Sequence, residues 1–199
     1  MKQKLKLALV GAGERGQYCY APYAKMHGYE IEFVAVADPH KGRREKFVQD
    51  YHVPAEGVFE TAEQFFARPR MADAVLICTQ DSQHYAYACQ AIDLGYSILL
   101  EKPISPSVRE CLDLQRRAEE KGTQIMVCHV MRYTKFYRKL KELIDSGVIG
   151  DVVHVTHTEN VAYWHYAHSY VRGNWHKTAD SSPMILAKCC HDMDILSWL

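Results

Sequence analysis

The sequence lacks an excess of charge of either sign: 24 lysines and arginines balance 24 aspartates and glutamates over 199 residues. Without a basic surplus, nothing favours binding to nucleic acid or another polyanion. The chain also lacks an uninterrupted apolar run of about 18 residues, the length needed to cross a bilayer. We therefore expect neither a nucleic acid nor a membrane among its partners.

The sequence also lacks any Cys-x-x-Cys pair, and its number of cysteines, seven, is odd. Both features argue against a disulfide framework. Most of these cysteines have apolar neighbours in the sequence, which predicts reduced, buried thiols in a cytoplasmic protein. Six histidines lie between His154 and His191, but vicinal cysteines such as Cys189-Cys190 lack the usual zinc spacing, so we expect no metal site.

What the sequence does contain is a glycine-rich turn between an apolar run, Leu5–Val10, and a helix-compatible run over 17–26. The turn reads Gly11-Ala12-Gly13-Glu14-Arg15-Gly16. In a Gly-x-Gly-x-x-Gly turn the first glycine permits a tight bend. The second lets the backbone approach a pyrophosphate, and the third lets the helix pack against the strand. The amino end of the helix then offers free N–H groups to the phosphates. This pattern predicts a dinucleotide site.

A second apolar run over 31–37 ends at Asp38, 22 residues after Gly16. An acidic residue at this spacing can accept hydrogen bonds from the ribose hydroxyls of the adenosine half. Its charge repels a 2′-phosphate, which favours NAD. NADP stays open, because several cations follow closely and could offset that charge: His40, Lys41, Arg43 and Arg44.

Apolar runs and helix-compatible runs alternate up to residue 128, with short connections between them. This alternation predicts an α/β fold of the Rossmann type, a doubly wound parallel sheet. Six strands are expected, near residues 5–10, 31–37, 58–59, 74–78, 97–100 and 125–128. Ligands of such sheets bind beyond the carboxyl ends of the strands. We assign residues 1–129 to a dinucleotide-binding domain.

The pattern changes after Met131, and we assign residues 130–199 to the beginning of a truncated α/β substrate-binding domain. An amphipathic helix is expected over 136–146 and a half-buried strand over 151–161, where valines alternate with polar residues. A single strong helix is expected over 182–199. Trp164 and Trp175 lie in an aromatic stretch that could stack on a sugar or pack in a core or interface.

Several of these residues together resemble the glucose–fructose oxidoreductase / inositol dehydrogenase / rhizopine-catabolism (Gfo/Idh/MocA) family of NAD(P)-dependent oxidoreductases. The glycine turn is similar to the family's cofactor turn, and Ala35-Val36-Ala37-Asp38-Pro39 resembles its second strand. Glu101-Lys102-Pro103 after an apolar strand resembles its most specific motif. Arg132-Tyr133 and the His191-x-x-Asp194 helix resemble the region after the Rossmann domain. The resemblance extends over essentially the whole chain.

The resemblance implies roles for individual residues. Lys102 would lie at the nicotinamide as an acid/base or proton-relay group, and His191 would be the catalytic histidine. Many members carry an aspartate four residues before this histidine, where this chain has Ala187 followed by Lys188. Glu101 and three residues after the fourth strand would line the cofactor groove: Thr79, Gln80 and His84. Arg132, Trp164, Trp175 and Lys188 are candidate substrate residues.

The family resemblance implies an oxidoreductase that transfers a hydride between NAD(P) and a carbinol carbon of a sugar, cyclitol or related polyol. One alternative is an NAD-using glycoside-cleaving enzyme without net redox change, and another is a non-catalytic, cofactor-binding regulator. Because family members are longer, we expect this chain to be the amino-terminal portion of such a protein. The full-length protein is expected to form a homo-oligomer.

Overall fold

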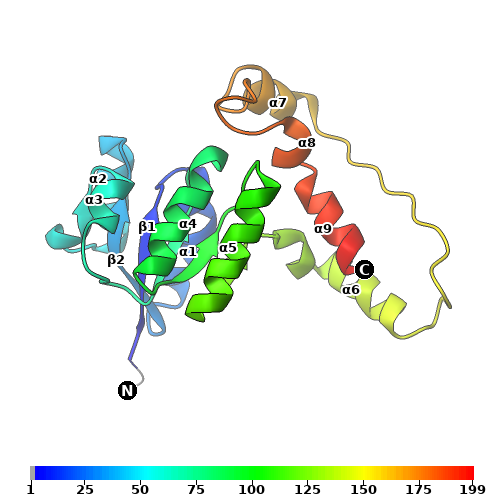
Figure 1. Ribbon diagram of the computed structural model, residues 1–199, viewed down its shortest axis with the longest axis horizontal. Helices are drawn as coiled ribbons and strands as arrows, with labels where there is room; N and C mark the ends of the chain where they lie inside the picture. Colours follow the sequence, from blue (N-terminus) through cyan, green and yellow to red (C-terminus); the bar gives the residue numbers. More distant parts are fainter. Residues whose placement is uncertain (1–2) are drawn as a thin grey trace. The chain divides into compact units, whose positions relative to one another are not determined.

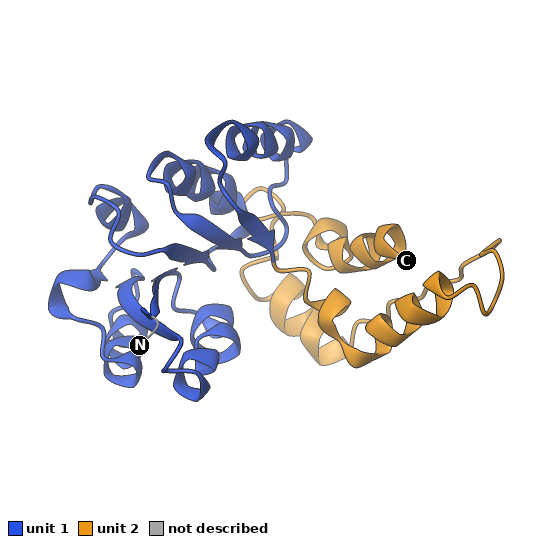
Figure 2. Cartoon of the chain, turned by 90° about the horizontal axis from the view of Figure 1, so that it is seen from below, with its two compact units in different colours: residues 1–127 blue, residues 128–199 orange. Residues whose placement is uncertain are grey.

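The computed structural model describes residues 3–199, and these residues cluster into two compact units. Unit 1 ends at Val127 and unit 2 spans Cys128–Leu199, as the colours of Figure 2 show. No helix within residues 3–199 combines the length and the hydropathy that a bilayer-spanning helix needs.

Unit 1 contains one sheet of six parallel strands in the order β3-β2-β1-β4-β5-β6. The order reverses direction between β1 and β4, so the sheet is doubly wound, as expected from the sequence. The inner strand β4 is a continuous apolar run, and β1 is apolar and buried over its last four residues, because helices cover both faces of the sheet. The strands are β1 (Leu5–Val10), β2 (Ile31–Ala37), β3 (Val58–Phe59), β4 (Ala74–Ile77), β5 (Ser97–Leu100) and β6 (Ile125–Val127).

Two hydrophobic cores flank the sheet. On one face, Leu9, Phe33 and Val36 pack against Phe47 of α2 (Lys41–Tyr51), and α1 (Pro22–Met26) contributes Ala24. The other face is covered by α3 (Ala62–Phe66), α4 (His84–Asp93) and α5 (Val108–Lys121), of which α4 and α5 lie side by side in Figure 1. Short turns of 3-10 helix connect the remaining parts: η2 (Ala55–Gly57) and η3 (Asp81–Gln83).

Side-chain caps fix where several of these helices begin. Thr61 accepts the N–H of Gln64 at the start of α3, and Ser107 accepts the N–H of Glu110 at the start of α5. Gly122 ends α5 in the left-handed conformation, with φ of 63°. These polar and glycine residues are typical signals of helix ends.

All the regular secondary structure within residues 128–199 is helical. Its elements are η4 (Val130–Tyr133), α6 (Lys135–Asp145), α7 (Tyr163–Tyr166), the π-helix η5 (Ala167–Val171), α8 (Met184–Ala187) and α9 (Cys190–Trp198). The strand expected over 151–161 is wrong, since residues 152–162 are irregular. A single strand is not stable without a neighbour, and no other strand lies within residues 128–199.

The single helix expected over 182–199 is also wrong. Pro183 caps α8 from outside the helix, and the chain leaves the helical conformation at Cys189, with φ of −80° and ψ of 1°, before α9 begins. The hydrophobic periodicity is continuous across this break, which is why the sequence alone favoured one helix.

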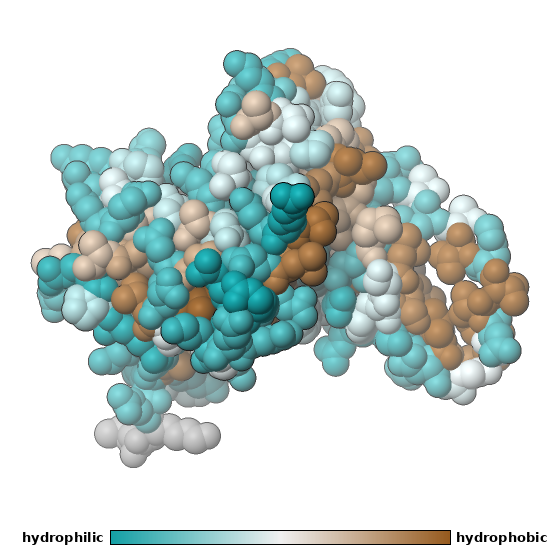
Figure 3. All heavy atoms as spheres, viewed as in Figure 1, coloured by the Kyte–Doolittle hydropathy of each residue, from teal (hydrophilic) through white to brown (hydrophobic). Residues whose placement is uncertain are grey.

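Unit 2 exposes many apolar side chains, visible as brown atoms in Figure 3. They include Phe136 of α6 and, on the irregular segment, Val153, of which 94% is exposed. The cysteine expectation needs correction here too: Cys128 is buried, five others are partly exposed, and Cys19 is exposed. All seven are free thiols.

Candidate functional site

The residues that directly follow four neighbouring strands lie at one level across the sheet of unit 1. The register pairs Val10 with both Ala37 and Ile77, and Ile77 with Leu100. The residues that come next along each strand therefore share one edge. They are Gly11, Asp38, Cys78 and Glu101, and three backbone N–H groups continue the ladder there: Gly11 to Ala37, Cys78 to Val10 and Glu101 to Ile77.

At two positions of the turn only glycine fits, because a side chain would clash with neighbouring backbone. Gly11 has a φ of 94°, and a Cβ there would lie 2.5 Å from the carbonyl oxygen of Cys78. A Cβ on Gly16 would lie 2.4 Å from the carbonyl oxygen of Gly11. Gly13 differs, because the nearest atom to its Cβ position is on Arg43 at 3.9 Å. The turn is thus tightly packed beneath Gly11 and Gly16 and open above Gly13.

The helix that follows the turn is a π-helix, η1 (Glu14–Tyr20), and α1 begins only at Pro22. The helical run expected over 17–26 is therefore present, but it is divided into a π-helix and a short α-helix at Ala21. Proline lacks the N–H that a helix interior needs, so Pro22 was the signal that the sequence analysis missed. The N–H of Ala21 bonds the carbonyl of Gly16, five residues back, which is the wide turn of a π-helix.

Asp38 is buried, and backbone donors hold both of its carboxylate oxygens. Oδ2 accepts the N–H of Ala12 at 2.7 Å, and Oδ1 accepts the N–H of His40 at 2.7 Å. Arg44, also buried, donates to the carbonyl oxygen of Asp38 at 2.6 Å and pairs with Glu60 at 3.1 Å. Asp38 is therefore a fixed carboxylate attached to the glycine turn.

Glu101 is buried, and both of its carboxylate oxygens accept hydrogen bonds. Oε1 accepts the phenolic hydroxyl of Tyr20, and Oε2 accepts the backbone N–H of Lys102 at 3.0 Å. Burial lowers the pKa of the Arg15 guanidinium, but the charges of Glu101, Cys19 and Tyr20 and a hydrogen bond to Cys19 together outweigh burial and raise that pKa. The sequence analysis missed Tyr20, because nothing in the sequence links it to a residue 81 positions away.

His84 at the start of α4 is buried between two backbone carbonyls. Its Nδ1 lies 2.7 Å from the carbonyl oxygen of Pro103, and its Nε2 lies 3.2 Å from that of Thr79. The ring thus ties the Lys102–Pro103 turn, which contains a cis peptide bond, to the end of β4. A ribose role for His84 stays a prediction.

Thr79 and Gln80 lie at the same sheet edge, after β4. The hydroxyl oxygen of Thr79 is buried, and no hydrogen-bond partner for it lies within residues 3–199. The backbone N–H of Gln80 bonds the side chain of Gln83 at 3.3 Å. A buried hydroxyl without a partner is costly, so this position favours a polar ligand atom.

Unit 2 contains His191, at the start of α9. The ring of His191 lies edge-on to that of His129, with 6.0 Å between ring centroids. Asp194, one turn later, accepts two hydrogen bonds from Arg132, at 2.6 and 2.7 Å, and lies 3.8 Å from Nε2 of His129. The partnership of Arg132 with Asp194 raises the pKa of the guanidinium. Arg132 is thus committed to an ion pair within unit 2.

One ion pair and one hydrogen bond link the region of α8 and α9 to the irregular segment. Lys188 pairs with Glu159 at 2.8 Å, and Asp192 lies 2.6 Å from Nε2 of His157. The Lys188–Glu159 pair lies next to Ala187, where the family pattern has an aspartate. Sequence reasoning missed Glu159 and His157, because it placed both on a strand.

The two candidate sugar-stacking tryptophans differ in exposure. Trp164 in α7 is exposed, and its ring stacks on that of His165 with 5.5 Å between centroids. Trp175 is only partly exposed. The exposure of Trp164 excludes core packing within the described part of the chain.

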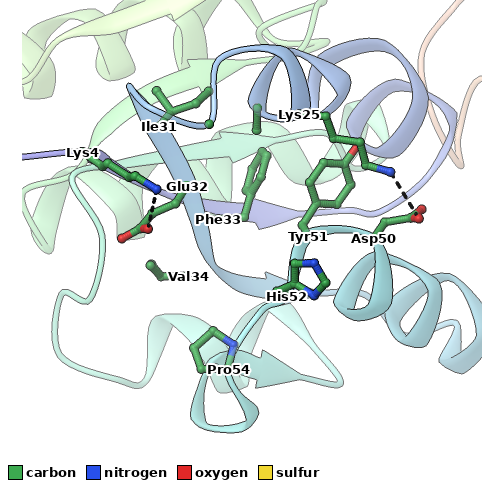
Figure 4. Close-up of a pocket in the computed structure, with 12 residues that line it drawn as sticks. Lys4, Lys25, Ile31, Glu32, Phe33, Val34, Asp50, Tyr51, His52 and Pro54 are labelled. Carbon is green, nitrogen blue, oxygen red and sulfur yellow. Dashed lines mark ion pairs between the residues drawn. The ribbon is translucent and has the colours of Figure 1, made fainter.

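A separate pocket opens near the amino end of β2, at the edge of the sheet away from Asp38 (Figure 4). Lys4, Glu32, Lys25 and Asp50 line it and form two ion pairs, Lys4–Glu32 at 3.9 Å and Lys25–Asp50 at 3.3 Å. The charges in this pocket are thus matched within the chain, and it is not the site that the sequence predicts.

The residues at the carboxyl edge fit a dinucleotide. The space above Gly13 lets a diphosphate approach the backbone, and the fixed carboxylate of Asp38 can accept ribose hydroxyls, since each oxygen retains a free lone pair. The unpartnered hydroxyl of Thr79 lies at the same edge. This fit rests on the geometry of the unit 1 residues alone.

Comparison with known proteins supports this assignment. Residues 5–129 match the family model described as "Oxidoreductase family, NAD-binding Rossmann fold". Residues 137–199 match the model described as "GFO/IDH/MocA C-terminal domain".

Individual relatives match along nearly the whole chain. An inositol 2-dehydrogenase of Pseudomonas savastanoi pv. phaseolicola is 29% identical over 197 residues, which cover 98% of this chain and 54% of that protein. A 2,7-anhydro-N-acetylneuraminate hydratase of Mediterraneibacter gnavus is 28% identical over 192 residues, covering 96% and 48%. The chain thus spans about half the length of these curated relatives.

Among solved structures, the WlbA dehydrogenase of Bordetella pertussis in complex with NADH and UDP-GlcNAcA superposes with a TM-score of 0.80 at 20% identity. The match covers 99% of this chain and 58% of that one. At this identity the likeness shows the fold alone.

Proposed function

Because this chain belongs to the Gfo/Idh/MocA oxidoreductase family, whose first domain is an NAD-binding Rossmann fold, we propose that the protein transfers a hydride between NAD and a carbinol carbon of a sugar, cyclitol or related polyol. One observation carries the proposal. The open glycine turn, the fixed Asp38 and the Glu101-Lys102 turn lie along one edge of the sheet.

Named residues of unit 1 would hold the cofactor. The backbone of Gly11–Gly16 would face the diphosphate, Asp38 the adenosine ribose, and Thr79 with Gln80 the groove beside them. When bound, the nicotinamide supplies a two-electron acceptor for the hydride of a carbinol carbon. The protein's own task is then to orient the carbinol and to remove its hydroxyl proton.

We assign the proton transfer to Lys102, with His191 as a second candidate. Lys102 follows β5 at the carboxyl edge, and Glu101 holds its backbone N–H. His191 is the family's histidine by sequence, and a neutral imidazole can accept a hydroxyl proton near neutral pH. Substitution of either residue by a non-titratable one is expected to abolish turnover while NAD affinity changes little.

NAD is favoured over NADP by the charges around Asp38. A 2′-phosphate would meet a carboxylate fixed by two backbone N–H groups. Arg44 does not offset this repulsion, because its side chain is buried and already binds the carbonyl oxygen of Asp38 and the carboxylate of Glu60. Lys41 pairs with Glu45 at 3.8 Å, which leaves the exposed Arg43 as the principal cation for a phosphate.

The relatives support the proposed substrate class. Those named above act on inositol, on an anhydro sugar acid, or bind a nucleotide sugar. A hydroxyl-rich ring is common to all three. The candidate substrate residues in unit 2, Arg132, Lys188 and the two tryptophans, stay proposals; Arg132 and Lys188 would have to share their existing carboxylate partners with such a ring.

A second function is favoured by one specific observation. The relative named as a hydratase adds or removes water, which involves no net change of oxidation state. For such a reaction a bound NAD would supply a temporary hydride acceptor, and oxidation of the carbinol would acidify the neighbouring C–H so that water could be eliminated or added with no net redox change. Accumulation of NADH during turnover would distinguish the dehydrogenase from this alternative.

Calorimetric titration of the protein with NAD⁺ and NADP⁺ tests the proposal first. We expect micromolar binding of NAD⁺ and weaker binding of NADP⁺, and we expect Asp38→Ser to reduce the difference. Absorbance at the NADH band would then be followed with a panel of inositols, hexoses and sugar acids. Binding of neither nucleotide would overturn the proposal.

A further inference from the structure

Tyr20 connects the end of the π-helix to the residue beside Lys102. Its phenolic hydroxyl donates to Oε1 of Glu101, and Oε2 of the same carboxylate accepts the backbone N–H of Lys102 at 3.0 Å. A single carboxylate therefore links the helix after the glycine turn to the backbone of the proposed proton carrier.

The π-helix determines where Tyr20 lies. The N–H of Ala21 bonds the carbonyl of Gly16, five residues back, whereas an α-helix would use the carbonyl four residues back. This turn of the helix therefore contains one residue more than a turn of α-helix. Such wide turns are rare and occur most often at functional sites. Tyr18, two residues earlier on the same helix, is 54% exposed, whereas Tyr20 is half-buried against Glu101.

Glu101 depends on these donors because it is buried. A carboxylate removed from water is stable only when hydrogen bonds or opposite charges replace its hydration. Tyr20 supplies a hydroxyl, Lys102 an N–H, and Arg15 a favourable charge. Without the hydroxyl, Oε1 loses its donor, and rotation of the carboxylate toward another one would also release the N–H of Lys102.

We propose that Tyr20 is a positioning residue: through Glu101 it fixes the backbone, and with it the amine, of Lys102. This inference rests on the proposed function, in which Lys102 moves the substrate proton. Tyr20 itself touches neither the substrate nor the nicotinamide in this proposal. His84 holds the other side of the same turn through the carbonyl of Pro103.

The test measures the environment of the Lys102 amine directly and needs no substrate. Purified protein is acetylated with a trace of acetic anhydride at a series of pH values, and mass spectrometry gives the labelling rate of Lys102 relative to Lys121. The variants are Tyr20→Phe, Glu101→Gln and the double variant, with Tyr18→Phe as the matched control. Circular dichroism confirms that each variant is folded.

We expect Tyr20→Phe to change the relative labelling rate of Lys102 by about fivefold, the change that corresponds to loss of one hydrogen bond of about 1 kcal/mol. Tyr18→Phe should leave it unchanged. Because Tyr20 acts through Glu101, adding Tyr20→Phe to Glu101→Gln should have no further effect. In turnover assays, kcat should fall while the Kd for NAD⁺ stays the same.

The possible failures are distinguishable. Wild-type labelling in Tyr20→Phe, or fully additive effects in the double variant, would overturn the positioning role and leave the proposed function intact. Full turnover by Lys102→Met would overturn the proposed role of Lys102, and the catalytic meaning of the Tyr20 link with it, whatever the labelling shows.

Discussion

Single side chains in unit 1 obtain their properties from a few exact contacts, and Tyr87 shows this most clearly. The hydroxyl of Tyr87 donates to Oε1 of Glu63 at 2.8 Å. Burial, followed by this hydrogen bond, raises the pKa of Tyr87 to about 12. The folded state thus holds the phenolic proton more tightly than the unfolded chain, whose tyrosines titrate near 10.

This shift predicts an alkaline loss of stability. The contribution of Tyr87 is complete below pH about 10, and it disappears as the pH rises toward about 12. We expect Tyr87→Phe to lower the unfolding free energy by about 1 kcal/mol at neutral pH. Above pH 10 the unfolding free energy of this variant should fall less steeply than that of the wild type. Urea denaturation at a series of pH values measures the unfolding free energy of the two proteins. Parallel plots of unfolding free energy against pH would contradict the prediction.

Asp38 illustrates what one residue can reveal from sequence alone. Its position after the second strand predicted a carboxylate at the carboxyl edge of the sheet, and the structure places it there; its contact with a nucleotide stays a prediction. Its two backbone donors, from Ala12 and His40, could not be predicted. They depend on the path of the glycine turn, which is set by tertiary packing and not by local propensity.

At the scale of elements, two glycines of the turn, Gly16 and Gly13, are expected to behave differently when replaced. Gly16→Ala would push a Cβ to within 2.4 Å of the carbonyl oxygen of Gly11, so we expect a loss of about 1–3 kcal/mol in unfolding free energy together with weakened NAD binding. In Gly13→Ala the nearest atom to the new Cβ is on Arg43, at 3.9 Å. The unfolding free energy should therefore change by no more than about 0.5 kcal/mol.

The two glycine variants together separate folding from binding. Gly13→Ala should nevertheless weaken NAD⁺ binding about tenfold or more, because its methyl group occupies the approach of the diphosphate. Thermal unfolding and calorimetric titration measure the two effects. Unchanged NAD⁺ affinity in Gly13→Ala would show that the diphosphate lies elsewhere.

Helix α9 is held by its aspartates, and Asp194 is the test case. Asp194→Ala removes both acceptors of Arg132 and the neighbour of His129. Because the arginine is more than a third open to solvent, we expect a cost of about 1–3 kcal/mol and not the larger penalty of a fully buried pair.

The exposed Lys139–Glu142 pair on α6 is the matched control for Asp194. Glu142→Ala should cost less than about 0.5 kcal/mol. Chemical denaturation followed by tryptophan fluorescence reports on unit 2, which contains Trp198, whose ring lies 5.7 Å from the Arg132 guanidinium carbon. Equal losses in the two variants would contradict the role given to Asp194.

The elements of unit 1 were predictable because local and global preferences agree there. Apolar runs such as Ala74–Ile77 form buried strands, and Thr61 and Ser107 cap the helices that follow them. In unit 2 the alternating valines favoured a strand over 151–161. A strand is stable only when it pairs with an adjacent strand, however, and hydrophobic periodicity does not show whether such a partner exists.

At the scale of the whole molecule, the chain combines a packed sheet domain with a helical unit in which a long irregular segment runs over 152–162. This segment has no backbone ladder to protect it, and Val153 is almost fully exposed. We expect limited proteolysis with elastase, which cleaves after small apolar residues, to cut first within 151–162.

Mass spectrometry of the proteolysis products tests this expectation, and NAD⁺ provides the control. Added NAD⁺ should slow any cleavage near Gly11–Gly16, and it should not change the first cut. A first cut within residues 3–127 would show that unit 1 is the less stable part of the molecule.

The wide turn of η1 also affects the alignment of this sequence with those of its relatives. A helix that closes over five residues carries one residue more than an α-helix along the same path. Compared with a relative whose helix is regular, the chain has an insertion inside the helix. An alignment that forbids gaps in helices would place Tyr20 one column from its true counterpart and would conceal its link to Glu101.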